Sequence, residues 1–133
     1  MFLKRKAVIA LCVCIAITQA CRHERDSAPD ITLTHEISPQ PPRVGPLTIT
    51  FRIADASGKP VTGVHVQVEM DMSHAGMKAI LAIARETEPG RYSSTIELSM
   101  AGDWFVMVYM TLPDGRKATR QFEINGVSQP VTP

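Results

Sequence analysis

The sequence predicts an all-β domain, an immunoglobulin-like β-sandwich of about seven strands. The chain has 133 residues, of which 44% are hydrophobic, and this length suits one domain with one core. Turn-forming Pro and Gly residues recur at short intervals between residues 39 and 115. The runs between them are rich in Val, Ile, Thr and Phe and often alternate apolar with polar residues. Short alternating runs between frequent turns are typical of sandwiches and barrels.

The first twenty residues are predicted to be a secretory signal that precedes this domain. Residues 1–6 include Lys4, Arg5 and Lys6, and residues 7–20 form an uncharged, mostly apolar stretch. That stretch has 14 residues, whereas a membrane-spanning helix needs roughly 20. A basic start, a short apolar run and small residues at its end are the features of a signal peptide. An uncleaved anchor helix is the alternative, which the short length disfavours.

Cys21 directly follows Ala20 and resembles the lipid-attachment cysteine of a bacterial lipobox. Cleavage before it would remove Cys12 and Cys14, so Cys21 would have no partner for an internal disulfide. Lipidation would protect this lone thiol in an oxidising compartment. We therefore expect a lipoprotein anchored in the membrane of the bacterial cell envelope, facing the periplasm. Ordinary signal cleavage after Ala20 would instead release the chain into the periplasm.

The charge balance argues against a nucleic-acid partner. The full chain has 14 basic and 13 acidic residues, a net charge of +1. Loss of Lys4, Arg5 and Lys6 with the signal leaves 11 basic against 13 acidic residues, a net charge of −2. Nucleic-acid binding calls for a strongly basic surface.

The predicted strands begin after a polar segment, residues 22–30, which is expected to be a flexible tether. The domain itself is expected over residues 31–126, followed by a tail over 127–133. Its first three strands are expected at 31–37, 47–53 and 64–70. In the second and third of these the apolar residues occur at every other position, which places them on one face of a half-buried strand.

The remaining strands are expected at 78–86, 95–100, 104–110 and 118–124. The segment 78–86 contains good helix formers and alternates poorly, but the hairpin through Pro89 and Gly90 needs a strand before it. The run from Trp104 to Met110 is apolar on both faces, which indicates a central strand or one with a covered outer face. In the last strand, Phe122 and Ile124 are predicted to point inward.

A cluster of soft metal ligands lies at residues 70–77, with the sequence MDMSHAGM. Met70, Met72 and His74 fall on one face of an extended chain, and Ala75-Gly76 would allow a turn that brings Met77 back. Thioether sulfur suits Cu(I), and imidazole suits several transition metals. These four residues are therefore the candidate copper ligands.

Packing is the alternative explanation for several of these methionines. Met70 continues the inward face of its strand and is better explained as core than as ligand. Met72, His74 and Met77 lie beyond the strand, where either a metal site or a protein contact would explain them. Met110 is expected in the core, and Met100 in the core or at the sandwich end near this loop. His23, His35 and His65 are weak ligand candidates.

Signs of catalysis are lacking in the sequence. It contains neither a nucleophile elbow nor a glycine-rich phosphate loop. Asp71 and His74 could exchange a proton, but no nucleophile lies near them in the sequence. We expect a binding protein and not an enzyme.

Several segments, in order, resemble the YtkA-like domain, which is related to the FixH family. They are residues 35–39, 41–45, 55–64, 72–77, 89–92 and 100–104, within about residues 31–125. The resemblance implies an exported immunoglobulin-like sandwich linked to copper handling or to assembly of respiratory copper oxidases, with Met72, His74 and Met77 as the family motif. Its partners would be a copper ion and an envelope protein such as a copper-accepting oxidase subunit or a copper transporter. FixH-type members carry an anchor helix where this chain resembles a lipoprotein. A non-metal interaction or structural module of the envelope is the alternative.

Overall fold

The computed structural model describes residues 26–73 and 76–132, and these form seven antiparallel strands. The strands are β1 (Thr32–Ser38), β2 (Gly45–Ala54), β3 (His65–Asp71), β4 (Ile80–Glu88), β5 (Arg91–Leu98), β6 (Gly102–Thr111) and β7 (Lys117–Val127). Within the described ranges, no helix is long and apolar enough to cross a membrane. The predicted signal, residues 1–20, lies outside the described residues, as do Cys21 and His23.

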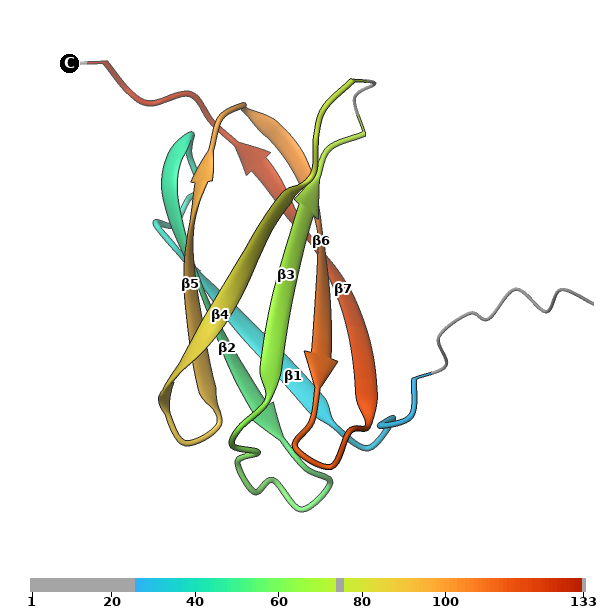
Figure 1. The fold of residues 1–133 in the computed structure, drawn as a ribbon. Helices are drawn as coiled ribbons and strands as arrows, with labels where there is room; N and C mark the ends of the chain where they lie inside the picture. The colour runs from blue at the N-terminus through green and yellow to red at the C-terminus, as the bar shows by residue number, and fades with distance from the viewer. Residues whose placement is uncertain (1–25, 74–75, 133) are drawn as a thin grey trace, which may run out of the picture.

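The strands hydrogen-bond in the order β1-β2-β5-β4-β3-β6-β7. β4 belongs to both halves of this ladder: Ile80–Ala84 pair with β3, and Arg85–Glu88 pair with β5. Figure 1 shows β4 running diagonally from the side of β3 to the side of β5. The result is one half-sheet of β1, β2, β5 and β4 against another of β4, β3, β6 and β7, the arrangement of an immunoglobulin-like sandwich. The predicted fold class is confirmed.

The core lies between the two half-sheets and follows the predicted alternation. Leu47, Ile49, Phe51 and Ile53 of β2 are all at most 1% exposed. From the facing half-sheet, β3 and β6 contribute residues at most 1% exposed: Val66, Val68, Met70, Trp104, Val106, Val108 and Met110. Ile124 is buried as predicted, while Phe122 is half-buried and packs against the core from β7.

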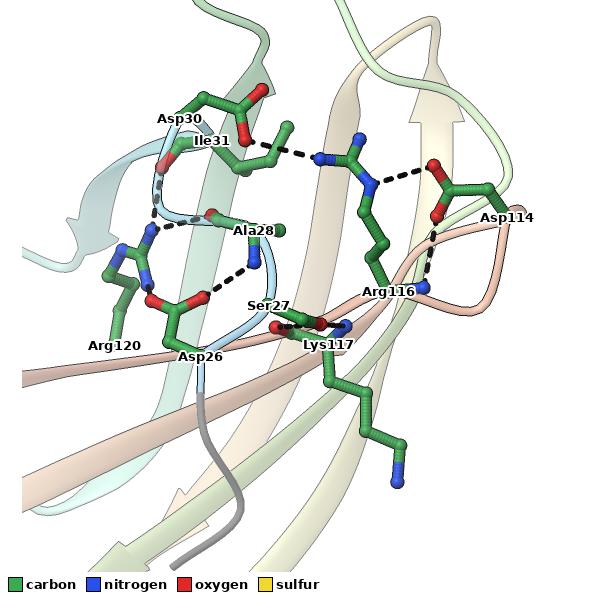
Figure 2. A network of polar contacts seen from close by, with 9 residues as sticks. All are labelled: Asp26, Ser27, Ala28, Asp30, Ile31, Asp114, Arg116, Lys117 and Arg120. Carbon is green, nitrogen blue, oxygen red and sulfur yellow. Dashed lines mark hydrogen bonds and ion pairs between the residues drawn. The ribbon is translucent and has the colours of Figure 1, made fainter.

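The segment before β1 is attached to the domain. Residues 26–30 were expected to belong to a tether, but they run along the start of β7 and contact it (Figure 2). The Ser27 amide donates to the carbonyl of Lys117 at 2.8 Å, and Asp26 forms an ion pair with Arg120. Ala28 and Ile31 are buried in the core. Of the predicted tether, only residues 22–25 lie outside the described part of the chain.

Candidate functional site

The candidate ligands surround the connection between β3 and β4, residues 72–79, at one end of the sandwich (Figure 1). Gly76 lies in a turn with φ +87°, a conformation that glycine adopts without steric cost. His74 and Ala75 lie outside the described residues. The structure therefore gives the positions of Met70, Met72 and Met77, but not that of the predicted imidazole ligand.

Met70 is a core residue, as the alternation of β3 indicates. Its side chain is 0% exposed, and it pairs with Ile80 of β4 and Val106 of β6. A ligand role would require its sulfur to leave this packed environment, where each buried methionine contributes hydrophobic contacts. We therefore assign Met70 to packing.

Met72 lies beyond the end of β3, yet it is only 4% exposed and belongs to the core cluster. Its Cε lies 2.9 Å from the point that a Cβ on Gly102 would occupy. Gly102 also has φ +127°, so the start of β6 has both the conformation and the open space that accommodate this methyl group. Beyond the strand the sequence favours a metal or contact role for Met72, but the structure shows that this residue also closes the end of the core.

Met77 returns from the loop to the same end of the sandwich. It is half-buried and packs against the core cluster that contains Met72. The expected turn at Ala75-Gly76 would bring Met77 back in this way. Met72 and Met77, which flank His74 in the sequence, thus both pack against the core.

A further methionine lies at this end of the molecule and was not among the predicted ligands. Met100 precedes Gly102 by two residues in the β5–β6 connection and is 39% exposed. Its carbonyl accepts a 3.1 Å hydrogen bond from Nε1 of the fully buried Trp104. The sequence predicted Met100 either in the core or at the sandwich end near the β3–β4 loop. Because β5 ends at Leu98, Met100 lies in the connection to β6, outside the core and at that end of the sandwich.

The charged and imidazole groups of the described residues offer little to a metal. Asp71 is half-buried, and its Oδ1 accepts the Met72 amide at 2.7 Å. His65 is exposed on β3, and His35 stacks on Phe122 with ring centroids 3.6 Å apart. Partial burial lowers the pKa of His35. Across residues 26–73 and 76–132, no group of three or more His, Cys, Asp or Glu side chains could hold a metal ion.

A groove lies away from these methionines, along the seam between β1 and β7. It has a volume of about 610 Å³ and is lined by His35, Glu36 and Glu123 among others, and by no methionine. Its position therefore does not mark the candidate site, which we base on the donor atoms of the β3–β4 loop.

Comparison with known protein families finds a match to one family model. The family model described as YtkA-like matches residues 29–109, a range that includes the whole β3–β4 loop. No curated protein matches the chain.

Two solved structures are distantly similar to this domain. The PmoD soluble domain from Methylocystis sp. (Rockwell) aligns with a TM-score of 0.46 and 16% identity, over 71% of this chain and 89% of that chain. MtrC from Shewanella baltica aligns with a TM-score of 0.39 and 13% identity, over 77% of this chain and 23% of that chain.

Proposed function

The chain belongs to the YtkA-like family, and from that premise we propose that it is a copper-binding protein of the bacterial cell envelope. In this proposal the β3–β4 loop holds one Cu(I) ion as cargo, through Met72, His74 and Met77. The protein acts as a carrier and not as an enzyme. It hands the ion to an envelope partner such as an oxidase subunit or a copper transporter.

The observation that carries the proposal is that both thioethers flanking His74 return to the same end of the core. Met72 belongs to the core cluster and Met77 packs against it. Two neutral soft sulfurs and one imidazole in six consecutive positions form a donor set that suits Cu(I). Met77 is also partly exposed, so in this proposal the ion enters the site from the side of Met77.

The electrostatic surroundings of the loop are compatible with a cation. The carboxylate of Asp71 lies at the end of β3, next to Met72. A negative group close to a cation binding site favours binding, and it does so more strongly where burial reduces screening by water. Neutral thioethers leave the ion its positive charge, which this carboxylate partly compensates.

The proposed location follows from residues 1–21. The signal would direct export, and a lipid on Cys21 would hold the domain at the membrane, facing the periplasm. This compartment is oxidising, and methionine and histidine serve there as copper ligands where a free thiol would be oxidised.

A competition titration with a chromophoric Cu(I) chelator tests the proposal. The full chain is expressed with its own signal, and the mature protein is purified from the envelope. We expect it to withdraw one Cu(I) per chain from the chelator. Stoichiometry near zero would contradict the proposal and favour a loop that contacts another envelope protein without metal.

Leucine variants identify the ligands in the same titration. Met72→Leu and Met77→Leu keep side-chain volume, so they should cost less than about 1.5 kcal/mol of stability. Each should weaken Cu(I) binding by about tenfold or more, since a tenfold loss corresponds to ~1.4 kcal/mol of binding energy. Met110→Leu is the matched control, because Met110 is a buried methionine on β6 that pairs with Val66 near the start of β3. If Met72→Leu and Met77→Leu bind Cu(I) as tightly as the Met110→Leu control does, the loop is excluded as the binding site.

A further inference from the structure

The seam between β1 and β7 contains a groove that no strand of the described residues fills. β1 and β7 are the two ends of the hydrogen-bonded strand order, and in the described ranges no ladder pairs one with the other. Instead, His35 of β1 and Phe122 of β7 meet across the seam through their stacked rings. Between this stack and the closure at Ser128, the groove of about 610 Å³ is lined by Ile37 and Ile124 among others. The seam is therefore open over one stretch between two closed points.

The free edge of β1 turns backbone groups toward this groove. Both backbone groups of Ile53 on β2 are bonded on the side away from β1. Successive residues of a strand turn their backbone groups to opposite sides, so Arg52 turns its groups toward β1, where it pairs with Thr34. The amides and carbonyls of His35 and Ile37, which alternate with Thr34, therefore face the seam.

The free edge of β7 does the same from the other side of the groove. The amide and the carbonyl of Lys117 are both bonded to Ser27, on the side away from β6. The pairing of β7 with β6 is regular from Lys117 to Ile124, so Gln121 and Glu123 also turn their backbone groups to the seam. Unpaired donors and acceptors along a strand edge are a template for an added strand.

Two carboxylates lie at the same level on the two rims of the groove. β1 and β7 run in the same direction, as the parallel bridge at the end of the seam shows. His35 is level with Phe122, so the residues that follow them, Glu36 and Glu123, are level with each other. Both line the groove, and by alternation both point outward from its isoleucine floor. Within the described part of the chain, neither carboxylate forms an ion pair.

The other charged groups near the groove leave this pair of carboxylates uncompensated. His35 is the third titratable residue of the lining, and partial burial lowers its pKa, which favours the neutral ring at pH 7. Two exposed cations lie outside the lining: Arg52, on β2 opposite Thr34, and Arg43, which bridges to Ser128 beyond the groove. The lining itself therefore carries two negative charges and no positive charge.

We propose that this groove binds a short extended segment of a partner protein in which a basic residue adjoins an apolar residue. The segment adds to the free edge of β7 and contacts β1 on its other side. Its basic side chain points outward between Glu36 and Glu123, about 5 Å from each strand neighbour. Its apolar side chain points inward, onto Ile37 and Ile124. The closures at both ends of the seam admit only a short segment and shield the rest of both edges.

Strand addition explains affinity and selectivity by different groups. Main-chain hydrogen bonds to the two edges supply affinity for any extended segment, and the alternating side chains supply selectivity. A cation shared by two carboxylates selects a basic residue, because opposite charges across an interface favour the correct partner. The groove lies away from the β3–β4 loop, so this proposal does not depend on copper binding.

A peptide titration followed by ¹⁵N NMR tests the proposal on the mature protein, purified as above. The probe is the capped peptide Ser-Thr-Lys-Val-Thr-Ser, and the control peptide has Glu in place of Lys. We expect the largest shifts at the amides of Ile37 and Glu123, and at least about tenfold weaker binding of the Glu peptide. The absence of shifts at the groove with millimolar Lys peptide, or equal binding of both peptides, would overturn the proposal.

Glutamine variants test the two carboxylates with the same Lys peptide. Glu36→Gln and Glu123→Gln should each weaken binding by about two- to fivefold, as expected for exposed ion pairs. Glu97→Gln is the matched control, because Glu97 is an exposed carboxylate on β5 outside the groove. An NMR spectrum otherwise like that of the wild-type protein shows that each variant is folded. Equal affinity in the two groove variants and the control would show that the carboxylates do not select the ligand.

A backbone-methylated probe tests strand addition separately from charge. The Lys peptide with an N-methyl group on its valine keeps both side chains but loses one main-chain donor, and the methyl group obstructs pairing with an edge. We expect binding to be lost, and hydrogen exchange at Ile37 and Glu123 to slow only with the unmethylated peptide. Undiminished binding of the methylated peptide would overturn strand addition.

Discussion

At the scale of single residues, Tyr92 ties β5 to the segment that leads into β3. Its side chain is 1% exposed, and its hydroxyl donates to the carbonyl of Val61 at 2.8 Å. The same oxygen accepts the amide of Val64 at 3.0 Å. One phenol thus satisfies two backbone groups about thirty residues earlier in the chain, where no strand pairing would satisfy them.

Tyr92→Phe should lower the free energy of unfolding by about 1–3 kcal/mol, because it leaves a buried amide and carbonyl without partners. Urea denaturation at neutral pH measures this loss. Tyr109→Phe is the control: Tyr109 is partly exposed on the outer face, so its loss should be smaller. Equal losses in the two variants would contradict the role assigned to Tyr92.

The same hydroxyl predicts a loss of stability in alkali. Burial, and secondarily the nearby Glu86 carboxylate, raises the pKa of Tyr92 from 10.0 to about 12. As the pH rises, Tyr92 therefore ionises in the unfolded chain before it ionises in the folded one. The stability that its buried hydroxyl contributes is complete below pH 10 and is lost as the pH rises toward about 12. We expect the difference in free energy of unfolding between the wild-type protein and Tyr92→Phe to shrink between pH 10 and about 12. A constant difference would contradict the assignment.

Met100 provides a residue-scale test of the copper site. It is 39% exposed and lies two residues from Gly102, beside which the Met72 methyl group packs. Met100→Leu should change the melting temperature little, because the side chain is outside the core. If its thioether joins Met72 and Met77 around the ion, Cu(I) affinity should fall by about tenfold, a loss of ~1.4 kcal/mol. Unchanged affinity would limit the site to the β3–β4 loop.

The sequence located the methionine cluster but could not separate ligands from packing residues. Alternation along β3 correctly assigned Met70 to the core, because its period continues from Val66 and Val68. Met72 and Met100 lie past the ends of strands, where periodicity no longer applies. Met72 is buried at a point where its methyl group packs beside Gly102, thirty positions away, whereas Met100 is 39% exposed. A long-range contact of this kind has no local signal in the sequence.

At the scale of elements, β4 explains why apolar and polar residues alternate poorly in the predicted strand at 78–86. Leu81 and Ile83 face outward, so both faces of its first half carry apolar residues. After Ala84 the strand leaves β3 and pairs with β5, with a register shift between Glu86 and Glu88. Strand pairing on both sides outweighs the helix preference of its Leu, Ala and Arg residues.

The turn between β4 and β5 depends on a glycine at position 90. Gly90 has φ +75°, and a Cβ there would lie 2.5 Å from Cβ of Pro60 and 3.0 Å from the carbonyl oxygen of Ile53. Its own carbonyl accepts the Ile53 amide at 2.9 Å. The Glu86 carboxylate accepts the amides of Gly90 and Gly63 at 3.2 Å each. The turn is therefore packed directly against the end of β2.

Gly90→Ala should be more destabilising than the same change at Gly115. Gly115 has φ +86° with nothing within 4 Å of the added carbon, so its variant loses only the conformational term, about 1–2 kcal/mol. Gly90→Ala adds a clash with backbone and proline atoms, which should cost about 1–3 kcal/mol more. The difference between the urea midpoints of the two variants measures the clash. Equal midpoints would show that the β4–β5 turn shifts enough to relieve it.

At the scale of the whole molecule, the seam between β1 and β7 is closed near both ends. At one end the Val44 amide donates to the carbonyl of Ser128 at 2.8 Å, and the Ser128 amide donates to Pro42 at 3.1 Å. In the middle, His35 stacks on Phe122. The segment 26–31 crosses the start of β7 at the other end (Figure 2). These contacts protect the free edges of the two outermost strands, which would otherwise be open to pairing with other chains.

Arg120 is the side chain that holds the N-terminal segment most directly. Its guanidinium donates to the carbonyls of Ala28 at 3.3 Å and Ile31 at 2.8 Å, and it pairs with the Asp26 carboxylate. Arg120→Gln should therefore loosen residues 26–31 while the sandwich stays folded. We expect faster amide hydrogen exchange at Ser27 and Ile31, measured by mass spectrometry. Arg52→Gln, which removes an equal charge from an exposed position on β2, should leave their exchange unchanged.

Acid should loosen the same segment in the unchanged chain. The Ala28 amide, and secondarily Arg120, lowers the pKa of Asp26 below 3.8. The stabilising interaction is therefore complete above pH 3.8 and is lost as pH falls through the lowered folded-state value. Exchange at Ser27, corrected for its intrinsic pH dependence, should rise in that range and approach the rate of Asp26→Asn. If neither acid nor Arg120→Gln accelerates exchange, the buried side chains of Ala28 and Ile31 hold the segment without help from the ion pair.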